Sequence, residues 1–360
     1  MVQIHNLQSS RVYKFISKII DNSIGVGSIN WPAFALMRFS LSFIVVTTHA
    51  IAYTKLPGPL IWIDKFNAFN AIIGFLLISG FSIGTSILKN QNGYFWRRVK
   101  RIYPVYISSI ILHYIVVPQE IDFIFTINIA INLVFLNQLV TKSSYVGPAW
   151  TLALEVWLYA LAPFFLRLNY KTLFIISILS FISYCFYTCG RSLFDWFYYS
   201  GVGFGLNLLF LSFIWVSGFM LAIFNKQIKS TSLLIGTLLL LHFSINFFIA
   251  LIYNIKHQKL DIFFSKDLVN FLFEIVCLIS IYYITISNRK LPIVSFHVRN
   301  VCNFLGNVSY PLYLTHSSAL ELCKKMHIDN WGFLIVFSFT LASIIYYIFD
   351  YYTKEKMVVT

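Results

Sequence analysis

The stretch MRFSLSFIVVTTHAIAY, residues 37–53, decides the fold of this chain. It reads as an apolar helix with two ionisable side chains, Arg38 near its start and His49 eleven residues later. Eleven residues turn a helix by about 1100° and advance it by about 16 Å, so both side chains lie on one face. Their separation is about half of the roughly 30 Å hydrocarbon core of a bilayer. Ionisable groups inside a membrane span are costly and mark functional sites, so this stretch predicts a functional membrane helix.

The composition of the whole chain indicates a membrane protein. Of 360 residues, 58% are apolar and only 11% are charged, whereas a soluble domain carries about 25% charged residues. The net charge of +14 is explained by loop residues that set topology and contact anionic membrane lipids. We expect no nucleic-acid binding, because no soluble segment is long enough to carry it. The five cysteines are scattered, and their spacing supports neither a disulfide framework nor a metal site.

Ten apolar runs are long enough to cross a bilayer. They lie near residues 34–54, 68–88, 102–118, 149–166, 171–189, 204–224, 231–253, 268–287, 305–323 and 332–352. A further run, 121–140, is interrupted by asparagines and a glutamine, so we expect it to be re-entrant or interfacial. The predicted fold is therefore all-α, a polytopic membrane bundle of about ten transmembrane helices plus that segment. A single membrane domain, 34–352, is expected between an N-terminal segment, 1–33, and a tail, 353–360.

The basic residues orient this bundle. Of the 27 lysines and arginines, 17 fall on one side of the predicted spans, nine fall on the other, and Arg38 lies within the first span. Because loops rich in basic residues stay in the cytoplasm, we expect both termini there. Arg38 then lies towards the cytoplasm and His49 towards the outer face.

This placement suits the two side chains to different tasks. An arginine low in the helix can bind an anionic ligand that enters from the cytoplasm. A histidine, with its near-neutral pKa, suits general base catalysis. Alternatively, His49 hydrogen-bonds a neighbouring helix and Arg38 reaches the inner lipid headgroups.

Two neighbouring stretches contribute small and basic residues at the inner surface. The sequence SGFSIG, residues 79–84, contains small residues that allow close helix packing. The sequence FWRRVKRIYPVY, residues 95–106, packs Arg97, Arg98, Lys100 and Arg101 into five positions. Such a cluster either sets topology and binds lipid or clamps a phosphate-rich ligand.

A carboxylate lies inside the span that begins near residue 149. The stretch VGPAWTLALEVWLYALAPFF, residues 146–165, places Glu155 about one and a half turns into the helix, at a depth similar to His49. If the two meet, Glu155 can orient His49 and stabilise its imidazolium. The alternative is that Glu155 pairs with another polar group for packing.

A second histidine follows near the end of the chain. The stretch LGNVSYPLYLTHSS, residues 305–318, places Tyr313 and His316 on a span that rises outward. His316 is a candidate for substrate hydrogen bonding or helix bracing. We assign no role to the remaining acids at the membrane edges, Glu274, Glu321 and Asp350.

Together these motifs resemble the acyltransferase-3 family of integral membrane acyltransferases, which includes O-antigen and capsule O-acetyltransferases. The resemblance lies in the spacing of Arg38 and His49, and in SGFSIG, FWRRVKRIYPVY, WTLALEVWLYALAP and NVSYPLYLTH, in that order. The family pattern near WSLSVEEQFYLLxP has a second acid where this chain has Val156, and Trp157 replaces the glutamine. The catalytic candidates His49 and Glu155 are both retained.

The resemblance implies transfer of an acyl group, usually acetyl from acetyl-CoA, to a hydroxyl of a cell-surface glycan or its lipid-linked precursor. Arg97, Arg98 and Arg101 would bind the CoA phosphates, and Arg38 the pyrophosphate or pantetheine region. We expect Trp150, Tyr313 and His316 to contact the substrate, no permanently bound cofactor, and a location in the bacterial inner membrane.

The implied mechanism has His49 as the base, supported by Glu155, with a covalent acyl-histidine as the main variant. Two other functions fit the same residues less well. A transporter or flippase for a glycan or anionic substrate would show inverted repeats, and the sequence has no such symmetry. A non-catalytic membrane assembly protein would tolerate replacement of the charged residues.

Overall fold

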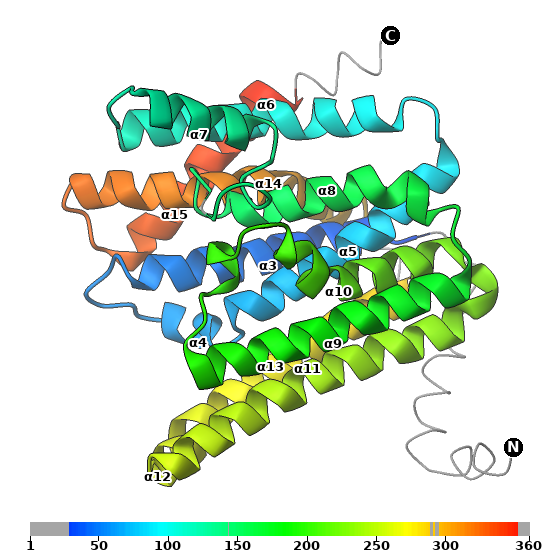
Figure 1. The fold of residues 1–360 in the computed structure, drawn as a ribbon. Helices are drawn as coiled ribbons and strands as arrows, with labels where there is room; N and C mark the ends of the chain where they lie inside the picture. Colours follow the sequence, from blue (N-terminus) through cyan, green and yellow to red (C-terminus); the bar gives the residue numbers. More distant parts are fainter. Residues whose placement is uncertain (1–28, 143, 289–290, 292–294, 352–360) are drawn as a thin grey trace, which may run out of the picture.

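The computed structural model describes residues 29–142, 144–288, 291 and 295–351. Every regular element in these ranges is a helix, and no strand occurs among them. Figure 1 shows most of the helices side by side and roughly parallel, as membrane spans are. The predicted all-α bundle is therefore confirmed. Most of the predicted N-terminal segment and the predicted tail lie outside the described residues.

Seven helical stretches are long and apolar enough to cross a membrane. They are α3 (Trp31–Ile51), α5 (Ala68–Lys89), α9 (Tyr170–Phe194), α10 (Leu206–Ile223), and three stretches that join adjacent elements: Asn225–Lys256, Leu260–Ile286 and Trp331–Phe349. The joined elements are η2 (Asn225–Gln227) with α11 (Ile228–Lys256), α12 (Leu260–Ile262) with η3 (Phe263–Asp267) and α13 (Leu268–Ile286), and α15 (Trp331–Ile345) with η5 (Tyr346–Tyr351).

Three further helices coincide with the remaining predicted spans. They are α6 (Tyr94–Val116), α8 (Ala149–Phe165) and α14 (Phe296–Lys325), and each contains an internal proline. Each of the ten predicted runs thus corresponds to a helix of the bundle. The connections add two short elements, α4 (Leu60–Asp64) and η1 (Tyr199–Gly201).

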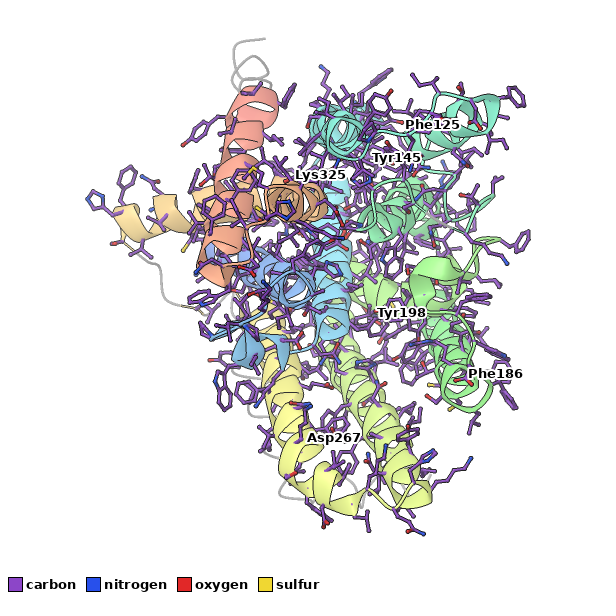
Figure 2. All side chains as sticks on the ribbon, turned by 90° about the vertical axis from the view of Figure 1, so that its left-hand side faces the viewer. Phe125, Tyr145, Phe186, Tyr198, Asp267 and Lys325 are labelled. Atoms are coloured by element: carbon purple, nitrogen blue, oxygen red, sulfur yellow. The ribbon has the colours of Figure 1, made fainter. Side chains whose placement is uncertain are left out.

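The segment predicted to be re-entrant contains α7 (Phe123–Leu133), which lies beside α6 (Figure 1). Its first turn lies near the C-terminal end of α6, where the rings of Phe125 and Tyr114 are 5.8 Å apart. Its last turn lies near the middle of α6, where the hydroxyl of Tyr106 donates to the carbonyl of Asn132. Figure 2 views the bundle end-on and shows Phe125 close to Tyr145, which lies on the returning chain. The segment therefore enters the bundle and returns to the same end, as predicted.

The tip of this segment is held by side chains from two helices. Tyr103 of α6 donates to the carbonyl of Leu133, and the indole of Trp157 in α8 donates to the carbonyl of Phe135. Phe135 has a positive φ of 58° and stacks its buried ring on Tyr106 at 4.6 Å. Non-helical backbone at membrane depth requires such internal hydrogen bonds, because lipid supplies none.

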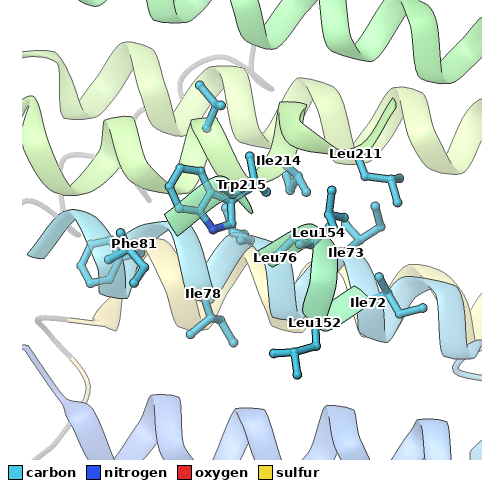
Figure 3. Packing of buried hydrophobic residues seen from close by; sticks show 14 of the residues in the cluster. Ile72, Ile73, Leu76, Ile78, Phe81, Leu152, Leu154, Leu211, Ile214 and Trp215 are labelled. Atoms are coloured by element: carbon cyan, nitrogen blue, oxygen red, sulfur yellow. The ribbon is translucent and has the colours of Figure 1, made fainter. Parts of the chain in front are cut away.

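The centre of the bundle is the crossing of α5 and α10. Figure 3 shows Trp215 and Ile214 of α10 facing Leu76 and Ile73 of α5. The backbones approach closely at two glycines: a Cβ on Gly80 would lie 2.0 Å from the carbonyl oxygen of Trp215. A Cβ on Gly218 would lie 2.2 Å from the carbonyl oxygen of Leu77. Close packing by the small residues of SGFSIG is confirmed at this crossing.

A second close pair, α3 and α14, positions the histidines. Gly306 of α14 lies against Ala35 of α3, where an added Cβ would come within 2.5 Å of the alanine Cβ. One turn further along, the hydroxyl of Ser42 donates to the carbonyl of Ser309 at 2.9 Å. These contacts fix the register in which His49, near the C-terminal end of α3, meets His316 of α14.

The glycine crossing gives a stability prediction. Gly218→Ala should destabilise the bundle by about 1–3 kcal/mol, because the new methyl group must push two backbones apart. Thermal unfolding of the purified protein in detergent measures the effect. Gly147→Ala is the matched control, since nothing lies within 4 Å of a Cβ at that position. Equal melting temperatures for the two variants would contradict the close crossing.

Candidate active site

A cavity of about 130 Å³ lies between α3, α5, α6, α8 and α14. Its charged lining residues are Arg38, Arg98, Arg101 and Glu155. Serine, threonine and tyrosine side chains supply most of the other polar groups, namely Ser79, Ser82, Thr151, Tyr159, Ser309, Tyr310 and Tyr313, together with Asn307. Three guanidinium groups against one carboxylate make this cavity suited to an anionic ligand with several negative charges.

Serine hydroxyls of α5 hold two of the three guanidinium groups. Arg38 donates to the hydroxyl of Ser82 at 2.6 Å, and Arg98 donates to the hydroxyl of Ser86 at 2.5 Å. Each of these bonds uses a single nitrogen of a group that has five N–H donors. Most donors of both arginines therefore remain available to a ligand in the cavity. The serines leave the positive charge itself uncompensated.

Glu155 belongs to this cavity rather than to the histidines. It accepts hydrogen bonds from the hydroxyl of Ser79, at 3.0 Å, and from that of Tyr159, one turn further along α8. Glu155 shares the cavity lining with Arg38, which lies eleven residues before His49 on α3. His49 is not part of that lining. No hydrogen bond joins Glu155 and His49, both of which the structure describes.

The four cations of the basic cluster separate into two groups. Arg98 and Arg101 line the cavity, whereas the lining does not include Arg97 or Lys100. Arg97 instead donates to the carbonyls of Asn90 and Asn92 in the α5–α6 connection. Through these two hydrogen bonds, Arg97 stabilises the connection between α5 and α6.

His49, near the C-terminal end of α3, meets His316 of α14. Nδ1 of His49 lies 2.7 Å from Nε2 of His316, and the two ring planes are nearly parallel, with centroids 5.0 Å apart. His316 is completely buried, but His49 is exposed. Among the described residues, Nε2 of His49 has no hydrogen-bond partner, so this nitrogen can meet a substrate.

Tyr313 separates the cavity from the histidine pair. Its side chain lines the cavity, and its ring centroid lies 6.2 Å from that of His316. Its hydroxyl forms a hydrogen bond of 2.6 Å with that of Thr151 in α8. Tyr313 therefore contacts both parts of the site, and its contact with substrate stays a prediction.

The other predicted site residues surround these two parts. Trp150 is buried at the start of α8, and its ring lies 6.5 Å from that of Tyr198, a half-exposed side chain labelled in Figure 2. Trp150 does not line the cavity. Among the described residues, no group of three or more histidines, cysteines or acids could hold a metal ion.

Two acids without an assigned role have structural partners. Glu274 accepts a hydrogen bond from Asn67 at 3.0 Å. Glu321 accepts one from the hydroxyl of Tyr53 at 2.5 Å. Partial burial, reinforced by this carboxylate, raises the pKa of Tyr53, which therefore remains the donor at neutral pH.

Comparison with known proteins identifies the family. A family model described as an acyltransferase domain, acyltransferase-3, matches residues 31–349. The chain belongs to this family. It is also 30% identical over 105 residues to a protein named putative acetyltransferase ORF330 from Acidianus two-tailed virus. That match covers 29% of this chain and 31% of the viral protein. No solved structure matches the chain.

Membership of the acyltransferase-3 family confirms the resemblance inferred from the motifs. Sequence reasoning nevertheless missed one residue of the site, Tyr159, and one contact within it. Tyr159 follows Glu155 by four residues, a spacing that places both on one helix face, and this signal was available. The contact between His49 and His316 had no comparable signal, because it depends on which helices are neighbours.

The separation of cavity and histidine pair gives a labelling prediction. In a background without its five cysteines, Ser82→Cys should react with a membrane-impermeant thiol reagent only from the side of Arg101. His49→Cys should react only from the opposite side. Labelling of sealed vesicles in both orientations measures this. Absence of labelling at position 49 from either side would show that this side chain faces lipid.

Proposed function

We propose that the protein transfers an acyl group, in most cases acetyl, from acyl-CoA on the cytoplasmic side to a hydroxyl of a cell-surface glycan or its lipid-linked precursor. The observation that carries this proposal is the arginine-lined cavity that ends at Tyr313, beside the exposed His49 and its buried partner His316. Family membership supports the acyl transfer itself.

The charge of the cavity fits the proposed donor. CoA carries its phosphates at one end and its thioester at the other, joined by a narrow pantetheine arm. Arg98 and Arg101, which lie on the α6 side of the cavity, suit the phosphates, and Arg38 suits the pyrophosphate or the start of the arm. Arg38 and His49 lie eleven residues apart on α3, so the thioester must extend about 16 Å beyond Arg38.

The proposed reaction joins the two parts of the site. His49 removes the proton from the acceptor hydroxyl, whose oxygen attacks the carbonyl carbon of the thioester. The carbon–oxygen bond forms, the carbon–sulfur bond breaks, and the proton held by His49 passes to the leaving thiolate of CoA. The alternative is an acyl-histidine intermediate. A nitrogen of His49 then attacks the thioester, so that a carbon–nitrogen bond forms as the carbon–sulfur bond breaks, and the acceptor oxygen next attacks the acyl carbon and displaces the histidine. In both routes the thioester reaches His49 past Tyr313.

Glu155 has a different proposed role from the one expected from sequence. Its hydrogen bonds from Ser79 and Tyr159 place its negative charge beside the cavity arginines. A single carboxylate there keeps the guanidinium groups in place and reduces their mutual repulsion while the cavity is empty. In this role Glu155 supports donor binding and does not orient His49. The side chain that contacts His49 is His316.

The proposed base can be tested by transfer of labelled acetyl. Purified protein in liposomes, given labelled acetyl-CoA and an undecaprenyl-linked glycan, should release CoA and acetylate the acceptor. His49→Ala should lower the rate by about 10²–10⁴-fold, the usual contribution of a general base. His257→Ala, which removes an exposed histidine remote from the site, is the control. Undiminished transfer by His49→Ala would contradict the mechanism.

The donor site can be tested by binding alone. Arg101→Gln should weaken acetyl-CoA binding by about tenfold or more, because a charge-assisted contact with phosphate contributes about 1.5–3 kcal/mol. Lys100→Gln removes the same charge from the adjacent, exposed position outside the cavity lining, so its affinity should remain that of the wild type. Isothermal titration calorimetry measures both. Equal losses for the two variants would indicate a general surface charge effect and contradict the site.

A further inference from the structure

His316 lies in the middle of a chain of hydrogen bonds that ends at His49. Its Nδ1 is 3.2 Å from the carbonyl oxygen of Leu312, one turn earlier in α14. Its Nε2 is 2.7 Å from Nδ1 of His49. The hydrogen bonds therefore lead from the backbone carbonyl of Leu312, through the completely buried ring of His316, to the exposed ring of His49.

The chemistry of these partners determines where the protons lie. A carbonyl oxygen only accepts hydrogen bonds. Nδ1 of His316 must therefore carry a proton and donate a hydrogen bond to the carbonyl of Leu312. In the neutral ring, Nε2 of His316 is then the acceptor. Nδ1 of His49 must consequently donate to it, which leaves the lone pair of His49 on Nε2. This is the nitrogen without a partner among the described residues.

We propose that His316 is a positioning residue that holds His49 in the tautomer with its basic nitrogen directed to the acceptor. The inference rests on the proposed function, because it assigns His49 the role of base. His316 thus does for His49 what a buried aspartate does for the histidine of a serine hydrolase triad. It differs in being neutral, so it fixes the tautomer without adding a negative charge.

The surroundings of the pair support this assignment. Among the described residues, no carboxylate forms a hydrogen bond with either ring. Glu155 is bonded to Ser79 and Tyr159, and Glu321 is bonded to Tyr53. The nearby His113 is bonded to the hydroxyl of Ser318 at 3.1 Å. His316 is therefore the group in direct contact with His49 that can select its tautomer.

When His49 takes up the acceptor proton, the same bond gains strength. The imidazolium of His49 donates from Nδ1 to Nε2 of His316, and this charge-assisted bond is stronger than the neutral one. The proton on Nδ1 of His49 stays there throughout. His316 therefore also stabilises the charge that develops on His49 as the hydroxyl attacks.

Two substitutions of His316 separate this role from simple packing. His316→Leu removes the acceptor, so His49 should shift to the tautomer with a proton on Nε2, and kcat should fall by about 10²–10⁴-fold. The KM for acetyl-CoA should remain unchanged, because the arginine-lined cavity is intact. His316→Gln returns an amide oxygen that can accept from Nδ1 of His49, so its kcat should stay within about tenfold of the wild type.

A spectroscopic measurement tests the tautomer without any substrate. In protein labelled with ¹⁵N-histidine, the His49 signals, assigned by comparison with His49→Ala, should show a protonated Nδ1 at neutral pH in the wild type. A protonated Nε2 in the wild type, or a wild-type kcat in His316→Leu, would overturn the inference. If His49→Ala is inactive but His316→Leu is fully active, only the role of His316 fails. If the wild type transfers no acyl group, the proposed function fails together with this role.

Discussion

Placing guanidinium groups inside a bundle of apolar helices is energetically costly, and the arrangement of the central helices follows from this constraint. A charge that leaves water must find polar partners within the protein. Arg38 and Arg98 find hydroxyls on α5, and Glu155 lies on the facing helix α8. Because α5 supplies these serines, it must lie between α3, α6 and α8. The glycine crossing with α10 anchors α5 in that position.

The pairing of α3 with α14 links the cavity to the catalytic candidates. Gly306 lets the two backbones approach closely, and the bond from Ser42 to Ser309 fixes their register. A shift of one residue along either helix would rotate the side chains by about 100° and separate His49 from His316. Packing about two or more turns away from His49 on α3 thus determines the geometry of the proposed base.

Much of this structure could be predicted from the sequence, and the limits have physical causes. The ten helices follow from the length of apolar runs, and the asparagines of 121–140 correctly marked a segment that turns back. The basic residues near 97–101 and Arg38 were expected to act together, and Arg38, Arg98 and Arg101 do share one cavity. The partner of His49 could not be predicted, because it depends on helix neighbours and on where each helix ends. Glu155 was placed beside His49 on depth alone, whereas its hydrogen bonds come from Ser79 and Tyr159 in the cavity.

The bond between Tyr313 and Thr151 has a consequence for the cell that holds this protein. A cavity rich in positive charge, opening at one surface and continuing to the other, would be a water-filled pore through which ions could dissipate the electrochemical gradient. The aromatic ring of Tyr313, held by its hydroxyl, lines this cavity, and neither His49 nor His316 does. In the proposed reaction, a donor molecule that displaces this ring would also fill the space it leaves. The membrane would then stay electrically insulating while the acyl group crosses it.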